Sequence, residues 1–182
     1  MSDNIDITKA IKQFNLNKDN EEKYEIYFDE ELGEFKYETT ADEATIINTI
    51  KISDLKVDNA SFKFGDSGLK LDEFKINVKK FFNMLKVVIK LQDKIVESLY
   101  KETLELCNIW DEVDDDGNPI TLEYVKNHID IVFLKIYKTS VQISATIYTD
   151  GDDENDGQEL LGGHFIEAII ESDDTEIKWY LA

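Results

Sequence analysis

The chain contains no arginine, and its 182 residues include one cysteine, one proline and two histidines. Without arginine it has no guanidinium group for bidentate contacts to phosphate, which argues against phosphoryl transfer and nucleic-acid reading. The single cysteine, Cys107, excludes an internal disulfide and a cysteine-rich zinc site. No run of about eighteen apolar residues occurs, and the first residues do not resemble a signal peptide, so we expect a soluble cytoplasmic protein.

Negative charge is what the chain has in excess. It has 40 acidic residues and 20 lysines, which gives a formal net charge of -20. Residues 111–182 carry 18 acids against 4 lysines, a net charge of -14, so the C-terminal part is the anionic pole. Such a field attracts cations and basic proteins over about 8 Å at physiological salt. The charge therefore favours a basic protein partner over nucleic acid or a membrane, and no cofactor is expected.

The length and hydrophobic pattern predict one α+β domain over residues 23–182. A polar segment with a short amphipathic motif at Ile7, Ala10, Ile11 and Phe14 precedes it, and we interpret residues 1–22 as a tethering helix and linker. Runs rich in β-branched and aromatic residues, separated by turn signals, predict two antiparallel meanders. The expected strands are 24–28, 33–37, 45–52, 57–64, 131–137, 140–148, 160–171 and 176–181.

A long helical pattern lies between the two meanders. The stretch between Gly68 and Gly117 has neither glycine nor proline, and apolar residues recur at spacings of three and four. One helix over this stretch would measure about 60 Å, which is long for a domain of this size. We therefore expect a break near Gln92, giving one long broken helix or a helical hairpin packed against the sheet. Thr121 then begins a short helix as its N-cap.

Two acidic loops are the candidate recognition sites. One follows the strand that ends at Tyr148, and the other follows the long helix, where three consecutive acids occur. Unpaired carboxylates are costly to bury, so each loop must face water, hold a cation or meet a basic partner. The partner-binding candidates are Asp150, Asp152, Asp153, Glu154, Asp156, Asp114, Asp115 and Asp116, with Tyr148 as an aromatic anchor.

The loop from Glu112 to Glu123 is close in spacing to an EF-hand calcium loop, with acids at positions one, three, five and twelve and glycine at six. Glu112 is longer than the aspartate that position one prefers, and Pro119 occupies position eight. A solvated turn between helices is the simpler interpretation, so no metal ligand is assigned. Calcium binding stays open as an alternative.

An enzyme is a further alternative, which would use His164 as a general base or metal ligand. His164 follows Gly162 and Gly163, a pair that permits a bulge or a close approach of the backbone. We favour a histidine that hydrogen-bonds a neighbouring backbone group or carboxylate. Cys107 fits a buried apolar residue. No catalytic residue is therefore assigned.

The order of motifs resembles a group of small bacterial domains of unknown function related to immunity proteins of polymorphic or contact-delivered toxins. The resemblance covers residues 24–182 and depends mainly on two segments, Leu32-Gly33-Glu34-Phe35-Lys36-Tyr37 and Gly163-His164-Phe165-Ile166. It implies no catalytic chemistry. The segment between Tyr148 and Glu159 is longer and more acidic here than in that group.

These observations favour a non-catalytic acidic binding protein, an immunity protein that covers a basic toxin. An anionic pole speeds encounter with a basic protein and competes with its anionic ligands. A nucleic-acid mimic that inhibits a defence or nucleic-acid enzyme would use the same charge, with acids spread across one face instead of gathered in loops. The sequence leaves this alternative open.

Overall fold

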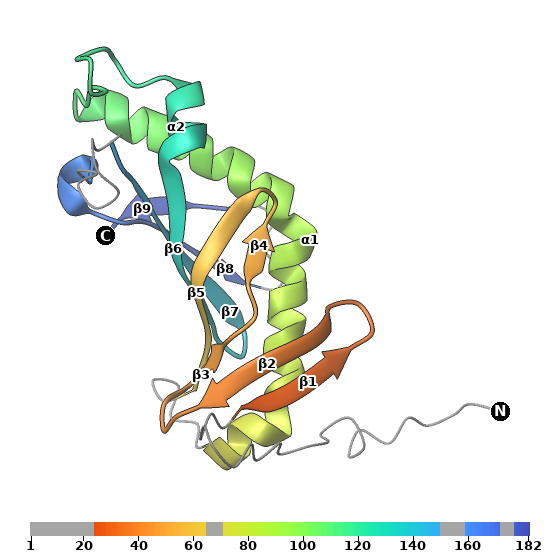
Figure 1. The fold of residues 1–182 in the computed structure, drawn as a ribbon. Helices are drawn as coiled ribbons and strands as arrows, with labels where there is room; N and C mark the ends of the chain where they lie inside the picture. Colours follow the sequence, from red (N-terminus) through yellow and green to blue (C-terminus); the bar gives the residue numbers. More distant parts are fainter. Residues whose placement is uncertain (1–23, 65–70, 150–158, 172–176) are drawn as a thin grey trace, which may run out of the picture.

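The computed structural model describes residues 24–64, 71–149, 159–171 and 177–182, which fold as an α+β domain. A nine-stranded sheet, counted over these residues, packs against the long helix α1 (Leu71–Ile109), and the short helix α2 (Leu122–His128) lies at one end (Figure 1). The expected segment 1–22 lies outside the described residues. The strands are β1 (Glu25–Asp29), β2 (Gly33–Thr39), β3 (Glu43–Ile46), β4 (Ile50–Ile52), β5 (Leu55–Lys63), β6 (Ile129–Ile136), β7 (Ser140–Ile147), β8 (Ile166–Glu171) and β9 (Trp179–Leu181).

Helix α1 is unbroken over 39 residues, so the expected break near Gln92 is wrong. Gln92 interrupts the apolar stripe because its side chain has another role: its Oε1 accepts the main-chain N–H of Ser53 at 2.9 Å and holds the β4–β5 turn against the helix. At 1.5 Å per residue α1 is about 58 Å long. The sheet contacts it along this length, from the β1–β2 hairpin near its start to β9, whose Trp179 donates to Ser98. Neither described helix combines the length and the apolar composition needed to cross a membrane.

Strands β5 and β6 pair in parallel, with Val57 opposite Ile131 and Phe62 opposite Ile136. Every other pairing between the described strands is antiparallel, as expected. The exception follows from the unbroken helix. Because α1 returns the chain to the end where β5 began, β6 must run in the same direction as β5. A helical hairpin would have left the chain at the other end and made this pair antiparallel.

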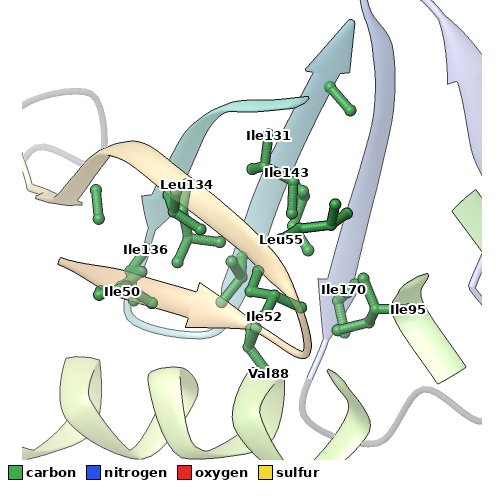
Figure 2. Close-up of a cluster of buried hydrophobic side chains, with 14 of the residues drawn as sticks. Ile50, Ile52, Leu55, Val88, Ile95, Ile131, Leu134, Ile136, Ile143 and Ile170 are labelled. Carbon is green, nitrogen blue, oxygen red and sulfur yellow. The ribbon is translucent and has the colours of Figure 1, made fainter. Parts of the chain in front are cut away.

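The main core fills the space between α1 and the sheet. Figure 2 shows Val88 and Ile95 of α1 directed at a layer of isoleucine and leucine side chains from β4 to β8. Alternation along each strand delivers one residue in two to this layer, as in β7, where Val141, Ile143 and Ala145 are fully buried. Burial of these apolar side chains is the dominant stabilising term of the fold.

The C-terminal strands β6 to β9 form the expected meander, and Thr121 caps α2 by accepting the N–H of Tyr124 at 3.1 Å. Strand β7 is also buried on the face that points away from α1. Ser144 and Thr146 are as buried as the residues on the helix side. Neighbouring side chains therefore cover this part of the sheet on both faces.

Asp29 fastens the β1–β2 hairpin to α1. Its Oδ1 accepts the Nζ of Lys86 at 2.7 Å and the main-chain N–H groups of Glu31 and Leu32 at 2.9 and 3.3 Å. Burial by itself raises the pKa of Asp29, but the hydrogen bonds from Lys86, Glu31 and Leu32 outweigh it, so the pKa lies below its ordinary value. A carboxyl group with a lowered pKa stabilises the fold above its unfolded pKa, about 3.9, and this contribution is lost as the pH falls towards the folded pKa.

We therefore expect Asp29→Asn to lower the free energy of unfolding at pH 7 by about 1–2 kcal/mol, because the amide keeps an acceptor but loses the ion pair. Urea denaturation between pH 7 and pH 2.5 measures this, and the difference from wild type should shrink below about pH 4. Glu30→Gln, at the exposed neighbouring position, is the matched control and should change little. A difference that stays constant down to pH 2.5 would contradict this assignment.

Candidate functional site

The first acidic loop begins where α1 ends. Asp111 has a left-handed backbone with φ of 54°, and the next N–H, that of Glu112, returns to the carbonyl of Cys107 at 2.9 Å. This arrangement terminates a helix and turns the chain away from its axis. Cys107 itself is fully buried, and burial, reinforced by the charge of Glu112, raises the pKa of its thiol to about 11. It is therefore an apolar core residue, as its sequence position indicates.

Asp114 organises the loop and does not point freely into solvent. Its Oδ1 accepts the N–H groups of Asp116 and Asn118 at 3.0 and 2.7 Å, and its Oδ2 accepts the side-chain amide of Asn118 at 3.3 Å. The main-chain hydrogen bond from Asn118 is the main cause that lowers the pKa of Asp114. Gly117, with φ of 80°, closes the turn. The loop thus presents Asp115 and Asp116 as exposed acids.

Glu112 joins this loop to the segment before β8. Its Oε1 accepts the N–H of Leu161 at 2.8 Å, across 49 residues of sequence. Beside this bond, the ring of Trp110 meets the His164 ring edge-on with centroids 5.7 Å apart. Gly162 has φ of 63°, and a Cβ there would lie 3.2 Å from the Trp110 ring. The glycine pair therefore provides the close approach that the sequence indicated, in a 3-10 turn instead of a β-bulge.

The second acidic loop begins and ends at the same end of the molecule. Tyr148 forms a β-bridge with Glu159, and the N–H of Leu160 donates to the carbonyl of Ile147 at 2.9 Å. Both flanks of the second loop are thereby held beside the turn that Glu112 binds. Tyr148 is half-buried. The candidate residues Asp150, Asp152, Asp153, Glu154 and Asp156 lie outside the described residues.

We call the surface formed by Asp111, Glu112, Asp114, Asp115, Asp116 and Glu159 the anionic end. Large apolar side chains are exposed beside it: Ile109 is 73%, Trp110 43% and Val113 45% accessible. Exposed apolar groups surrounded by charge are common where one protein binds another. Aromatic residues in particular supply binding energy in such interfaces.

His164 has a structural environment. Its Nδ1 lies 2.9 Å from the main-chain oxygen of Ala182, and its ring packs on Trp110. The residue thus links β9 to the turn before β8, in agreement with the backbone hydrogen bond expected from the sequence.

The spacing of the EF-hand pattern does not correspond to a cation cage. Glu112 and Asp114, at positions one and three, both accept main-chain N–H groups of the protein. In the part of the chain that the structure describes, no group of three or more histidine, cysteine or acidic side chains is arranged to hold a metal ion. The geometry therefore gives the calcium alternative no support.

One polar cluster was not identified from the sequence. Glu167 of β8 is 8% accessible, and its carboxylate accepts hydrogen bonds from Ser144, from Gln142 at 2.9 Å and from Tyr180 at 3.2 Å. These residues come from three neighbouring strands on the face opposite α1. The signal that could have located the cluster is the register that places Glu167 between Ser144 and Tyr180. The sequence alone shows that all four residues are polar, but it does not show that they are neighbours in the sheet.

Comparison with protein-family models, with curated protein sequences and with solved structures finds no match to this chain.

Proposed function

We propose that the protein is a non-catalytic binding protein whose anionic end docks on a basic protein, and that it acts as an immunity protein against a bacterial toxin. The observation that carries this proposal is the hydrogen bond between Glu112 and Leu161. Through it, one acidic loop and both flanks of the other lie at the same end of the molecule. A partner that docks on the first loop therefore also lies beside both flanks of the second.

The charge and the exposed apolar groups have complementary roles in this proposal. The acids steer a basic partner to the anionic end and raise the association rate. Trp110 and Ile109 then supply apolar contact area, and burial of such groups slows dissociation. The acids of the anionic end are gathered at one end of the molecule. This supports recognition of a protein partner over mimicry of a nucleic acid, for which acids would follow one extended face.

The test measures binding between the purified chain and the product of the adjacent gene at physiological salt. Asp115→Asn combined with Asp116→Asn, and with Asn or Gln at the five acids from Asp150 to Asp156, should weaken binding by about tenfold or more, mainly through slower association. Asp114 is left intact because it organises its loop. Co-expression should also lose its protection against the toxicity of that partner.

The control variant neutralises exposed acids far from the anionic end, Glu30, Glu34 and Glu38, and should bind like wild type. Retained binding in the variant of the anionic end would contradict the proposal. Competition by nucleic acid for the same partner surface, without protection from toxicity, would favour the nucleic-acid mimic.

A further inference from the structure

A groove runs between α1, the β4–β5 turn and α2, on residues that the anionic end does not include. Its volume is about 530 Å³, within the range of roughly 300–1,000 Å³ that is common for ligand sites. The main-chain N–H of Ser53 donates a hydrogen bond to the side chain of Gln92, which places the β4–β5 turn at one end of the groove. Lys126 of α2 lies over the Tyr100 ring at 5.9 Å, which places α2 at the other end (Figure 1).

The floor of the groove is apolar. It consists of Val96, Tyr100 and Leu104 from consecutive turns of α1, and of Leu122 from α2. Leu122 is 43% accessible although it is a large apolar residue. Apolar side chains that line an open groove are available to the side chains of another molecule.

The rim of the groove carries opposite charges at its two ends. Asp54, Asp93 and Glu97 lie at the end next to the β4–β5 turn, whereas Lys101 and Lys126 lie towards α2. Asp54 and Tyr100 both line the groove, and burial, together with the negative charge of Asp54, raises the pKa of Tyr100. The ion pairs found among the described residues include none of these three acids. A cationic group could therefore enter that end without displacing a lysine from an ion pair described in the structure.

We propose that this groove binds a short extended peptide segment of a partner protein, with a lysine or arginine at the acidic end and an aliphatic side chain on Tyr100, Leu104 and Leu122. Carbonyl groups or a carboxylate of the segment accept hydrogen bonds from Lys101 and Lys126. The charge order of the rim selects this occupant, because a uniformly acidic or uniformly basic segment meets repulsion at one end. The site goes beyond the proposed function, since the groove and the anionic end share no residue.

The probe is the peptide acetyl-Lys-Leu-Leu-Glu-amide, titrated into the isotope-labelled full chain and followed by amide chemical shifts. Saturable shifts are expected at Ser53, Asp54, Tyr100, Leu104 and Leu122. Acetyl-Glu-Leu-Leu-Glu-amide and acetyl-Lys-Ser-Ser-Glu-amide should each bind about tenfold more weakly, because one meets like charge and the other lacks apolar contacts. The reversed sequence is no control, since a peptide can lie in either direction.

Two charge-reversal variants localise the effect. Glu97→Lys, on the exposed side of α1 at the groove, should weaken binding of the lysine peptide by about tenfold. Glu38→Lys makes the same change in net charge on β2 and should bind like wild type. Equal affinities for the three peptides, equal affinities of the two variants, or shifts spread outside the groove would each overturn the proposal. These measurements do not involve the toxin partner, so their failure leaves the proposed function intact.

Discussion

Replacing Phe62 by alanine is expected to lower the free energy of unfolding by about 3–5 kcal/mol, the usual range for deleting a fully buried aromatic side chain. Phe62 of β5 is fully buried and lies at the centre of a cluster of aromatic rings, which we call the aromatic core. Its ring centroid is 4.6 Å from that of Phe82 and 5.9 Å from that of Phe74. Both partners belong to α1, so the substitution removes contacts that hold the helix against the centre of the sheet.

The size of the effect follows from the neighbours of Phe62. Tyr37 of β2 and Phe81 of α1 also meet its ring edge-on, at 6.4 and 6.0 Å. Such pairs contribute about 0.5–1.5 kcal/mol beyond the buried area. Four rings from two elements cannot all move to fill the space, so a cavity remains and its cost adds to the lost burial.

Urea denaturation monitored by far-UV circular dichroism measures the change. The matched control is Phe28→Ala, because Phe28 of β1 is 57% accessible, and it should lose less than about 1 kcal/mol. Equal losses in the two variants would show that the aromatic core does not hold α1 on the sheet.

Local patterns in the sequence predicted most elements of the fold. Runs of β-branched and aromatic residues located β6, β7 and β9, and the Thr121 cap located the start of α2. The error at Gln92 arose from helix length: a single helix of about 60 Å is long for a domain of this size, but the sheet contacts α1 from the β1–β2 hairpin to β9. That one error also hid the parallel pairing of β5 and β6, since the direction of β6 depends on the end of the sheet to which α1 returns the chain.

The candidate site could be predicted only in part, because it depends on contacts between residues that are far apart in the sequence. Spacing identified the acids of the first loop, but only the fold shows that Asp114 is occupied by its own turn and that Glu112 holds Leu161. Contacts over 49 residues leave no periodic signal in a sequence. The groove beside Tyr100 also combines three elements far apart in the chain, and no local pattern marks it.

Replacing Glu167 by alanine is expected to destabilise the fold by about 2–4 kcal/mol, because three donors lose their shared acceptor. Ser144 is fully buried, so its hydroxyl cannot turn to water in compensation. Gln142 and Tyr180, from the strands on either side, lose the same carboxylate. The loss in free energy of unfolding should therefore be similar to that for removing one partner of a buried polar network. It should be larger than the loss for replacing an exposed acid.

Glu167→Gln separates the charge from the hydrogen bonds. The amide keeps one acceptor oxygen but turns an N–H donor towards groups that are themselves donors, so its loss should lie between wild type and Glu167→Ala. Glu38→Ala, at an exposed site on β2, should change stability by less than about 0.5 kcal/mol. If Glu167→Gln is as stable as wild type, the carboxylate charge is not needed and only its acceptor geometry stabilises the cluster.

The pH dependence gives a second, independent signature of the same cluster. Burial, together with the charge of Glu167 and its hydrogen bond, raises the pKa of Tyr180. A tyrosine whose folded pKa is raised stabilises the fold below its unfolded pKa, about 10, and this contribution is lost as the pH rises through the folded pKa. Glu167→Ala should therefore lose less stability than wild type above pH 10, measured by urea denaturation at pH 8 to 11. An identical alkaline loss in both proteins would show that Tyr180 does not depend on the Glu167 carboxylate.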